Sequence, residues 1–260
     1  MAGQISSGGM LPGQTSLGGI DAYVVKIAPF NQPPDCSGAI IADQTADATC
    51  QATISEADVT GVIDPEGDPL TITVNPTILS LGANTLTVTA DDGNGGICSI
   101  DISVNVDDIT APVADLATLV DVTAECEVTS LTPPTATDNC GTVTVTNDAT
   151  LLISGTTVVT WTYDDGNGNT TNQTQNVVID DTILPVITCP ADITQTADAG
   201  NCSAVVTYIA PIGSDNCTGP STIQTAGLAS GEAYPVGTTT NTFEVIDAAG
   251  NTAIVVLMSQ

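Results

Sequence analysis

The stretch that decides the fold is "GANTLTVTADDGNGG" at residues 82–96. Leu86, Val88 and Ala90 alternate with threonines, and this two-residue period is typical of a strand that buries one face. Two aspartates and a run of glycine and asparagine then end the alternation. Gly and Asn readily take the positive-φ positions of a hairpin turn, and Asp can hydrogen-bond to the local backbone. The stretch therefore predicts a half-buried strand that leads into a hairpin.

The same pattern occurs three times along the chain. It returns as "GTTVVTWTYDDGNGN" at 155–169 and as "GTTTNTFEVIDAAGN" at 237–251. The equivalent hairpin aspartates are Asp92, Asp165 and Asp247. A repeat of this length is longer than a solenoid repeat and is typical of tandem small domains.

Acidic joints, "VDDITAP" at 106–112 and "IDDTILP" at 179–185, divide the repeats. Trp161 alternates in phase with Val159 and Tyr163, so we expect it in a core. Short alternating runs without a helical stripe predict an all-β fold of three tandem immunoglobulin-like β-sandwich modules in an extended rod. The predicted organisation is a lead-in or linker at 1–28, followed by modules at 29–109, 110–182 and 183–260.

The charge balance excludes several classes of function. The chain has 30 Asp plus Glu against a single Lys or Arg and no His, which gives a formal net charge of −29. Nothing could neutralise the phosphates of nucleic acid or of an anionic membrane. No apolar run is long enough for membrane insertion. Without His, acid–base chemistry would fall to carboxylates in hydrated turns, so we expect no enzyme.

Six of the eight cysteines form three regularly spaced pairs. Long, regular spacings without C-x2-C motifs or His favour disulfides over zinc, and hence an oxidising, extracellular or cell-surface setting. Each short disulfide loop would contribute roughly 3 kcal/mol to the stability of a small domain. The predicted bonds are Cys36–Cys50, Cys126–Cys140 and Cys189–Cys202.

Calcium is the ligand that the acidic clusters favour, because it takes roughly six to eight oxygen ligands. Candidate ligands lie in "DPEGD", in two hairpin turns and in the joints. They are Asp64, Glu66, Asp68, Asp91, Asp92, Asp107, Asp108, Asp164, Asp165, Asp180 and Asp181. None of these clusters has the full EF-hand spacing. The alternative is that these acids are solvated and that the hairpin aspartates only hold their turns.

Longer motifs resemble known families. Residues 183–253, with "PVITCPADITQTADAGNCSAVVTYIAPIGSDNC" and "PVGTTTNTFEVIDAAGNTA", resemble the hyalin repeat (HYR), an immunoglobulin-like extracellular module associated with adhesion. The second module, with "DVTAEC", "PTATDNC" and "VIDDTILPV", resembles related repeats of large surface adhesins of Bacteroidetes-type bacteria. "DPEGDPLTITV" at 64–74 is similar to the acidic motif of bacterial cadherin-like domains. "LGGIDAYVVKIAP" at 17–29 resembles part of a bacterial surface β-propeller repeat.

The HYR resemblance implies a bond between the cysteine of a "DNC" motif and a cysteine late in the last strand. Cys217 belongs to such a motif, but the region after residue 251 has no cysteine, so the third module looks incomplete at its last strand. Cys98 has no "DNC" partner in its own module. We therefore expect Cys98 and Cys217 to be free thiols or links to another chain. "DTI" resembles a Bacteroidetes O-glycosylation acceptor, which makes Thr182 a candidate glycosylation site.

Composition and resemblance together predict a non-catalytic extracellular segment of a bacterial cell-surface protein, held by disulfides and stiffened by calcium. A second interpretation is a filament subunit assembled by strand exchange or other intermolecular contacts. A third is a glycan-binding module, although the single Trp is expected in the core. The predicted partners are surface glycans or proteins, or copies of the chain itself in a filament.

Overall fold

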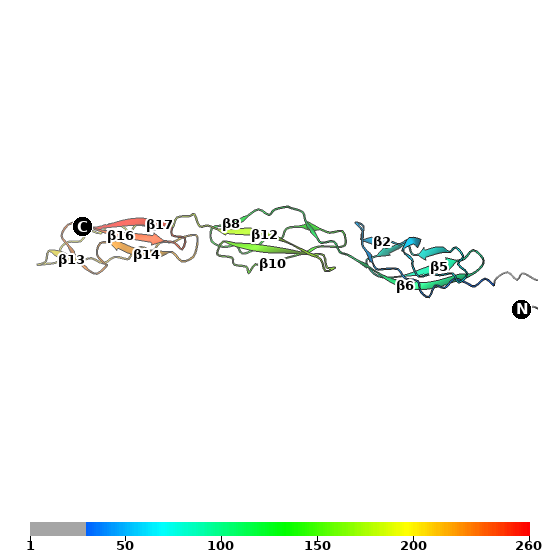
Figure 1. Cartoon of the computed structure of the whole chain (residues 1–260). Helices are drawn as coiled ribbons and strands as arrows, with labels where there is room; N and C mark the ends of the chain where they lie inside the picture. The colour runs from blue at the N-terminus through cyan, green and yellow to red at the C-terminus, as the bar shows by residue number, and fades with distance from the viewer. Residues whose placement is uncertain (1–29) are drawn as a thin grey trace, which may run out of the picture. The chain divides into compact units, whose positions relative to one another are not determined.

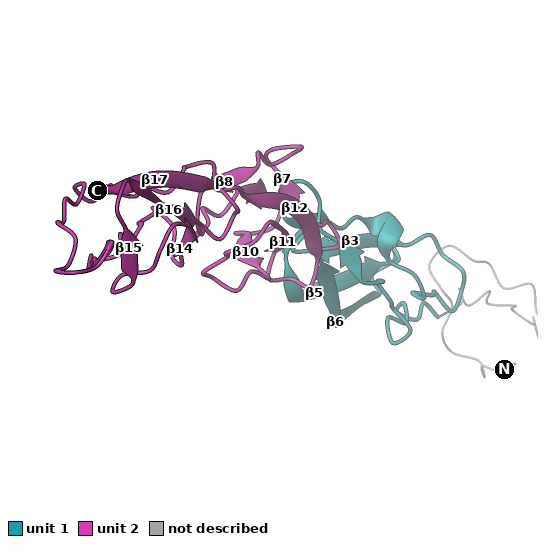
Figure 2. Ribbon diagram, turned by 90° about the vertical axis from the view of Figure 1, so that its left-hand side faces the viewer, with its two compact units in different colours: residues 1–108 teal, residues 109–260 magenta. Residues whose placement is uncertain are grey.

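The computed structural model describes residues 30–260. They divide into two compact units, one that ends at Asp108 and one that spans Ile109–Gln260 (Figure 2). The predicted lead-in at 1–28, with its resemblance to a propeller repeat, lies outside the described residues.

The first unit is built around the predicted hairpin. Gly82 lies opposite Val106 and Asp91 opposite Ile97, so the chain reverses at the acidic turn between them. The larger sheet has the order β1-β6-β5-β3, and β2 pairs with β4 in a smaller sheet. The elements are β1 (Gln44–Thr45), β2 (Gln51–Thr53), the 3-10 helix η1 (Glu56–Asp58), β3 (Thr71–Asn75), β4 (Ile78–Ser80), β5 (Gly82–Asp91) and β6 (Ile97–Asp107) (Figure 1).

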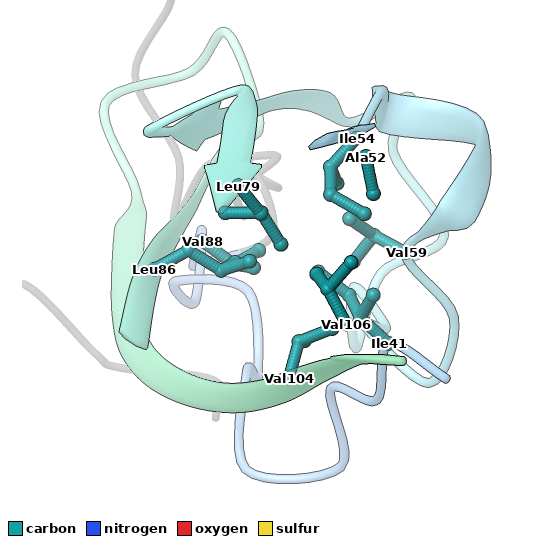
Figure 3. Packing of buried hydrophobic residues seen from close by; sticks show 9 residues of the cluster. All are labelled: Ile41, Ala52, Ile54, Val59, Leu79, Leu86, Val88, Val104 and Val106. Carbon is teal, nitrogen blue, oxygen red and sulfur yellow. The ribbon is translucent and has the colours of Figure 1, made fainter. Parts of the chain in front are cut away.

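The core of the first unit lies between these two sheets. Leu86 and Val88 of β5 point towards Leu79 of β4, as Figure 3 shows. Burying one side chain of this kind stabilises the fold by roughly 1.5–3 kcal/mol. The inward face that the alternation predicts is therefore confirmed. The buried residues of the cluster are Ile41, Ala52, Ile54, Val59, Leu79, Leu86, Val88, Val104 and Val106.

The second unit contains two groups of sheets that follow each other along the chain. In the first group, the sheet β10-β11-β12-β8 accompanies the pair β7-β9. The strands are β7 (Val113–Ala114), β8 (Val122–Ala124), β9 (Ala136–Thr137), β10 (Thr144–Asn147), β11 (Thr157–Asp164) and β12 (Thr170–Ile179). In the second group, the sheet β14-β16-β17 accompanies the pair β13-β15. Its strands are β13 (Ser203–Val205), β14 (Ser221–Ala226), β15 (Ala233–Pro235), β16 (Thr239–Ile246) and β17 (Thr252–Ser259).

Trp161 and Tyr163 fill the core of the first group and are fully buried, as the alternation predicts. Their polar atoms are satisfied across the β11–β12 hairpin. The indole Nε1 of Trp161 donates to Gln175 Oε1 at 2.9 Å, and the hydroxyl of Tyr163 donates to Gln173 Oε1 at 2.6 Å. The rings therefore bury their apolar surface without leaving a donor unpaired.

In all three repeats, an early segment pairs parallel with the last strand. The paired residues are Gln44 with Val106, Val122 with Val177, and Ile193 with Ser259. The prediction of an all-β fold with immunoglobulin-like sandwiches is confirmed. The division at 29–109, 110–182 and 183–260, and the extended rod, stay predictions.

Candidate functional site

Two disulfides join cysteines that are far apart in the sequence. Cys36 bonds to Cys98, with 5.8 Å between their Cα atoms, and Cys126 bonds to Cys217, with 5.3 Å. Both distances lie in the usual disulfide range of roughly 4.4–6.8 Å. The first bond lies within the first unit. The second joins the two groups of sheets of the second unit.

The remaining cysteines fall into two states. Cys50 and Cys140 are disulfide-bonded, whereas Cys189 and Cys202 are free and exposed. The predicted bonds are therefore wrong, namely Cys36–Cys50, Cys126–Cys140 and Cys189–Cys202. The expectation that Cys98 and Cys217 are free or bonded to another chain is also wrong. Regular spacing reflects the recurrence of similar loops, but the way the sheets bring segments together decides which sulfurs meet.

The joint between the two groups of sheets is held from both sides. The backbone N–H of Thr182 donates to Glu125 Oε2 at 2.6 Å, and its hydroxyl donates to Oε1 at 3.1 Å. On the other side, Asn251 Nδ2 donates to the carbonyl oxygen of Asp181 at 2.9 Å. Because Glu125 precedes Cys126, the disulfide and these hydrogen bonds fasten the same joint.

The hairpin aspartates hold their own turns. Asp165 is buried, and its Oδ1 accepts from the backbone N–H groups of Asn167 at 2.7 Å and Asn169 at 3.0 Å. Its Oδ2 accepts from Asn169 Nδ2 at 2.7 Å. Burial acts to raise the pKa of Asp165, but the side chain and backbone of Asn169, with neighbouring N–H groups, outweigh it and lower the pKa. Asp92 and Asp247 are buried in the same way, and hydrogen bonds lower the pKa of each.

The second unit contains two pairs of aspartates, and in each pair the two carboxylates lie close together. Oxygens of Asp181 and Asp215 lie within 4.8 Å of one another, as do oxygens of Asp138 and Asp165. Cys217 lies beside the first pair, but its sulfur is part of a disulfide and cannot act as a thiolate ligand. The only Lys or Arg of the sequence is Lys26, so no basic side chain at 30–260 neutralises these pairs.

Asp138 has a further feature that is expected of a cation ligand. Its Oδ2 accepts from the backbone N–H of Cys140 at 2.7 Å. Its Oδ1 is buried and has no hydrogen-bond partner among the described residues. A buried carboxylate oxygen without a partner is costly, and a bound cation would remove that cost.

The "DPEGD" loop of the first unit is also brought to a hairpin turn. Asp64 Oδ1 accepts from the N–H groups of Glu66 at 2.9 Å and Asp68 at 3.0 Å. Its Oδ2 is buried without a partner in the described part of the chain. Asp68 Oδ2 accepts from Asn94 Nδ2 at 2.9 Å, which ties the loop to the turn. Glu66 accepts from the side chain of Gln32 at 2.9 Å instead.

The other predicted ligands have local roles or less defined ones. Asp91 and Asp164 each accept a hydrogen bond at 2.8 Å from the backbone N–H two residues later. Asp107 accepts from the amide of Asn105. The backbone N–H of Asp180 donates to Ala124 at 3.1 Å, and Asp108 is buried.

Sequence reasoning missed Asp138 and Asp215 as candidate ligands. Each is the first residue of a "DNC" motif, and the recurrence of that motif was the available signal. It also missed Glu125 and Asn251, whose contacts across the joint depend on how the chain folds.

Residues 180–256 match the family model of the HYR domain. Hyalin of Lytechinus variegatus is 35% identical over 189 residues, which cover 68% of this chain and 35% of hyalin. Hyalin of Strongylocentrotus purpuratus is 35% identical over 184 residues, which cover 65% of this chain and 15% of hyalin. These matches support HYR modules in this chain. The chain spans about a third of the first relative and less of the second.

Two solved structures are among those that this chain is similar to. "Sidekick-1 immunoglobulin domains 1-5" is 10% identical, with 89% of this chain and 59% of that chain covered and a TM-score of 0.39. "Crystal Structure of Mouse Cadherin-23 EC22-24" is 14% identical, with 89% and 99% covered and a TM-score of 0.29. Among the described residues, no helix has the length and apolar character that crossing a membrane would require.

Proposed function

We propose that this chain is a non-catalytic, extracellular segment of a cell-surface protein, with a structural and adhesive role. The HYR match and the hyalin relatives support the adhesive part. The disulfides support an oxidising, extracellular location. The resemblance of 110–182 to Bacteroidetes surface repeats supports a bacterial origin, and the recurring hairpins support three modules, at 29–109, 110–182 and 183–260.

The observation that carries this proposal is the joint of the second unit. A disulfide, the bonds of Thr182 to Glu125 and the bond of Asn251 to Asp181 all fasten consecutive groups of sheets to each other. A catalytic site has no need of a braced connection between repeats. A protein that transmits tension or holds two surfaces at a distance does need one.

Calcium is the second element of the proposal. The Asp181–Asp215 pair and the Asp138–Asp165 pair offer closely spaced carboxylate oxygens, and Asp138 adds a buried oxygen without a partner. These hard oxygen donors fit calcium, and backbone carbonyls and water would complete its shell. We expect an affinity on the order of 10⁻⁴–10⁻³ M, as in other extracellular modules. Calcium bound at the Asp181–Asp215 pair would neutralise these two charges and so stiffen the joint.

Calcium titration of the whole chain tests this element. We expect millimolar calcium to raise the melting temperature and EDTA to reverse the rise, with a smaller effect of magnesium at the same ionic strength. Asp181→Asn combined with Asp215→Asn should remove a large part of the calcium response. Asp198→Asn, at an exposed aspartate of the same unit, should leave it intact. Equal responses to calcium, magnesium and matched sodium chloride would indicate charge screening alone.

Beads coated with the whole chain test adhesion. Calcium-dependent clustering of the beads would support contacts between copies of the chain. Binding to immobilised glycans without clustering would favour the glycan-binding alternative, and uniform helical fibres in electron micrographs would favour the filament alternative. An inert coating in all three assays would contradict an adhesive role for this segment.

Mass spectrometry of native material would test Thr182 as a glycosylation site.

A further inference from the structure

Three cysteines recur at an equal interval, at positions 50, 126 and 202. Cys50 immediately precedes β2, and Cys202 immediately precedes β13. Cys126 lies two residues before Val128, which bridges Ile153 at the corresponding place. The second residue after each cysteine is buried in its sandwich, namely Ala52, Val128 and Ala204. The three cysteines are therefore equivalent positions of the repeat.

These equivalent positions differ in bonding state. Cys50 and Cys126 are disulfide-bonded, whereas Cys202 is free and exposed. The partner of Cys126 is Cys217, the cysteine of the "DNC" motif in the group of sheets that comes next along the chain. At the second of the three equivalent positions, the cysteine thus bonds forward to the "DNC" cysteine of the next group of sheets.

We infer that Cys202 is the covalent attachment point for a further HYR-type module, through the thiol of that module's "DNC" cysteine. A second copy of this chain offers no free thiol of this kind, because both of its "DNC" cysteines, Cys140 and Cys217, are already bonded. The partner is therefore a module with its own unpaired "DNC" cysteine.

The surroundings of Cys202 suit such a partner. The backbone N–H of Val236 donates to the carbonyl oxygen of Cys202 at 3.2 Å, and the side chain of Val236 is 74% exposed. A docked module would cover this apolar side chain. The other free cysteine is different, because the thiol of Cys189 donates to Val256 O at 2.9 Å within its own sandwich. Cys189 also has no counterpart in the repeat of positions 50, 126 and 202.

The bond forms by thiol–disulfide exchange with a small disulfide such as oxidised glutathione. The Cys202 thiolate attacks the small disulfide, forms a mixed disulfide and releases one reduced thiol. The thiolate of the "DNC" cysteine then attacks the mixed disulfide at the Cys202 sulfur and releases the second reduced thiol. The two protein thiols are oxidised by two electrons, the small disulfide is reduced, and the two protons pass to the released thiolates.

A fusion tests the inference on the whole chain. A copy of residues 179–260 is placed directly after Gln260, because Ser259 and Val177 hold equivalent places beside Ile193 and Val122. Cys189 and Cys202 are replaced by Ser in the copy only, so the "DNC" cysteine is its one cysteine. After incubation in a glutathione redox buffer, alkylation and non-reducing peptide mapping follow the thiols. We expect loss of alkylation at Cys202 and a peptide that joins Cys202 to the "DNC" cysteine of the copy.

Matched variants sharpen the test. In the parent part, Cys202→Ser should leave the "DNC" thiol of the copy reactive, whereas Cys189→Ser should leave the new bond intact. The native Cys126–Cys217 bond reports that the fusion folds. If it is lost, a second fusion appends residues 106–182, with Cys126→Ser, and offers Cys140 instead. A Cys202 that stays reactive in a folded fusion, or an equal bond to Cys189, would overturn the inference, as would failure of both fusions to form the bond.

Discussion

The two groups of sheets in the second unit, at 113–179 and 203–259, share one plan but differ at their centres. In the first, Val159 and Val177 are buried apolar residues of the β11–β12 hairpin. The repeat places Asn241 and Ser259 at the corresponding positions of the β16–β17 hairpin, and both are buried too. Both positions are buried in each group of sheets, but the side chains are apolar in the first group and polar in the second.

The polar centre works because its hydrogen bonds are made. Asn241 Oδ1 accepts from the backbone N–H of Leu228 at 2.9 Å and from the hydroxyl of Tyr234 at 3.3 Å. Its Nδ2 lies 3.5 Å from the hydroxyl oxygen of Ser259. A satisfied buried amide is nearly neutral, but it contributes less than an apolar side chain of the same size. We therefore expect residues 203–259 to unfold more readily than residues 113–179.

Trp161→Ala should cause the largest loss of stability, because it removes the largest side chain of the apolar centre. We expect a loss of about 3–5 kcal/mol in the free energy of unfolding of residues 113–179, measured by calorimetry of the whole chain. Phe243→Ala, at the equivalent depth of the other centre, is the matched control and should act on residues 203–259. If Trp161→Ala moved both transitions equally, the two centres would not be independent.

Removing the disulfide between the two groups of sheets should cause the second-largest loss of stability. Replacing both Cys126 and Cys217 by Ser should destabilise the second unit by about 2–4 kcal/mol, because the cross-link no longer restricts the unfolded chain. Trp161 is the only Trp, so its fluorescence reports on residues 113–179, while hydrogen exchange follows residues 203–259. We expect the two transitions to separate further. Replacing Cys36 and Cys98 instead should leave the Trp161 signal unchanged.

Exchanging the two centres tests their chemistry directly. Val159→Asn should cost about 1–3 kcal/mol, because it buries an amide without the partners that Asn241 has. Asn241→Val should also destabilise its sandwich, since the N–H of Leu228 loses its acceptor. Each effect is measured as a shift in the denaturant midpoint of its own sandwich. A stabilising Asn241→Val would show that the polar centre is a cost and not a requirement.

Asp165→Asn should have the smallest effect, and that effect depends on pH. Hydrogen bonds hold the pKa of Asp165 below its ordinary value of 3.8, so the carboxylate contributes stability above about pH 4. That contribution is lost as the pH falls through the lowered pKa of the folded state. We therefore expect the variant to melt a few degrees below the wild type at pH 7, and the gap to narrow below pH 4. A gap that stays constant from pH 7 to pH 3 would contradict this role.

The hairpins could be predicted from the sequence because strand alternation and turn chemistry are local signals. Leu86, Val88, Trp161 and Tyr163 are buried as their alternation predicts, and Asp165 holds its turn. The disulfides could not be predicted, because the meeting of Cys126 with Cys217 depends on how consecutive sandwiches stack. Only one member of the Asp181–Asp215 pair could be predicted. The acidic joint indicated Asp181, but Asp215 lies in a motif that only the fold brings close to it.

The parallel pairing of early and last strands has a mechanical consequence. β8 and β12 run side by side in the same direction, with Val122 opposite Val177. When the chain is pulled at both ends, one strand is drawn backwards and its neighbour forwards. The hydrogen bonds between them are then loaded in shear and must break together, whereas a peeled hairpin opens one bond at a time. A chain built in this way would resist stretching far better than its equilibrium stability suggests.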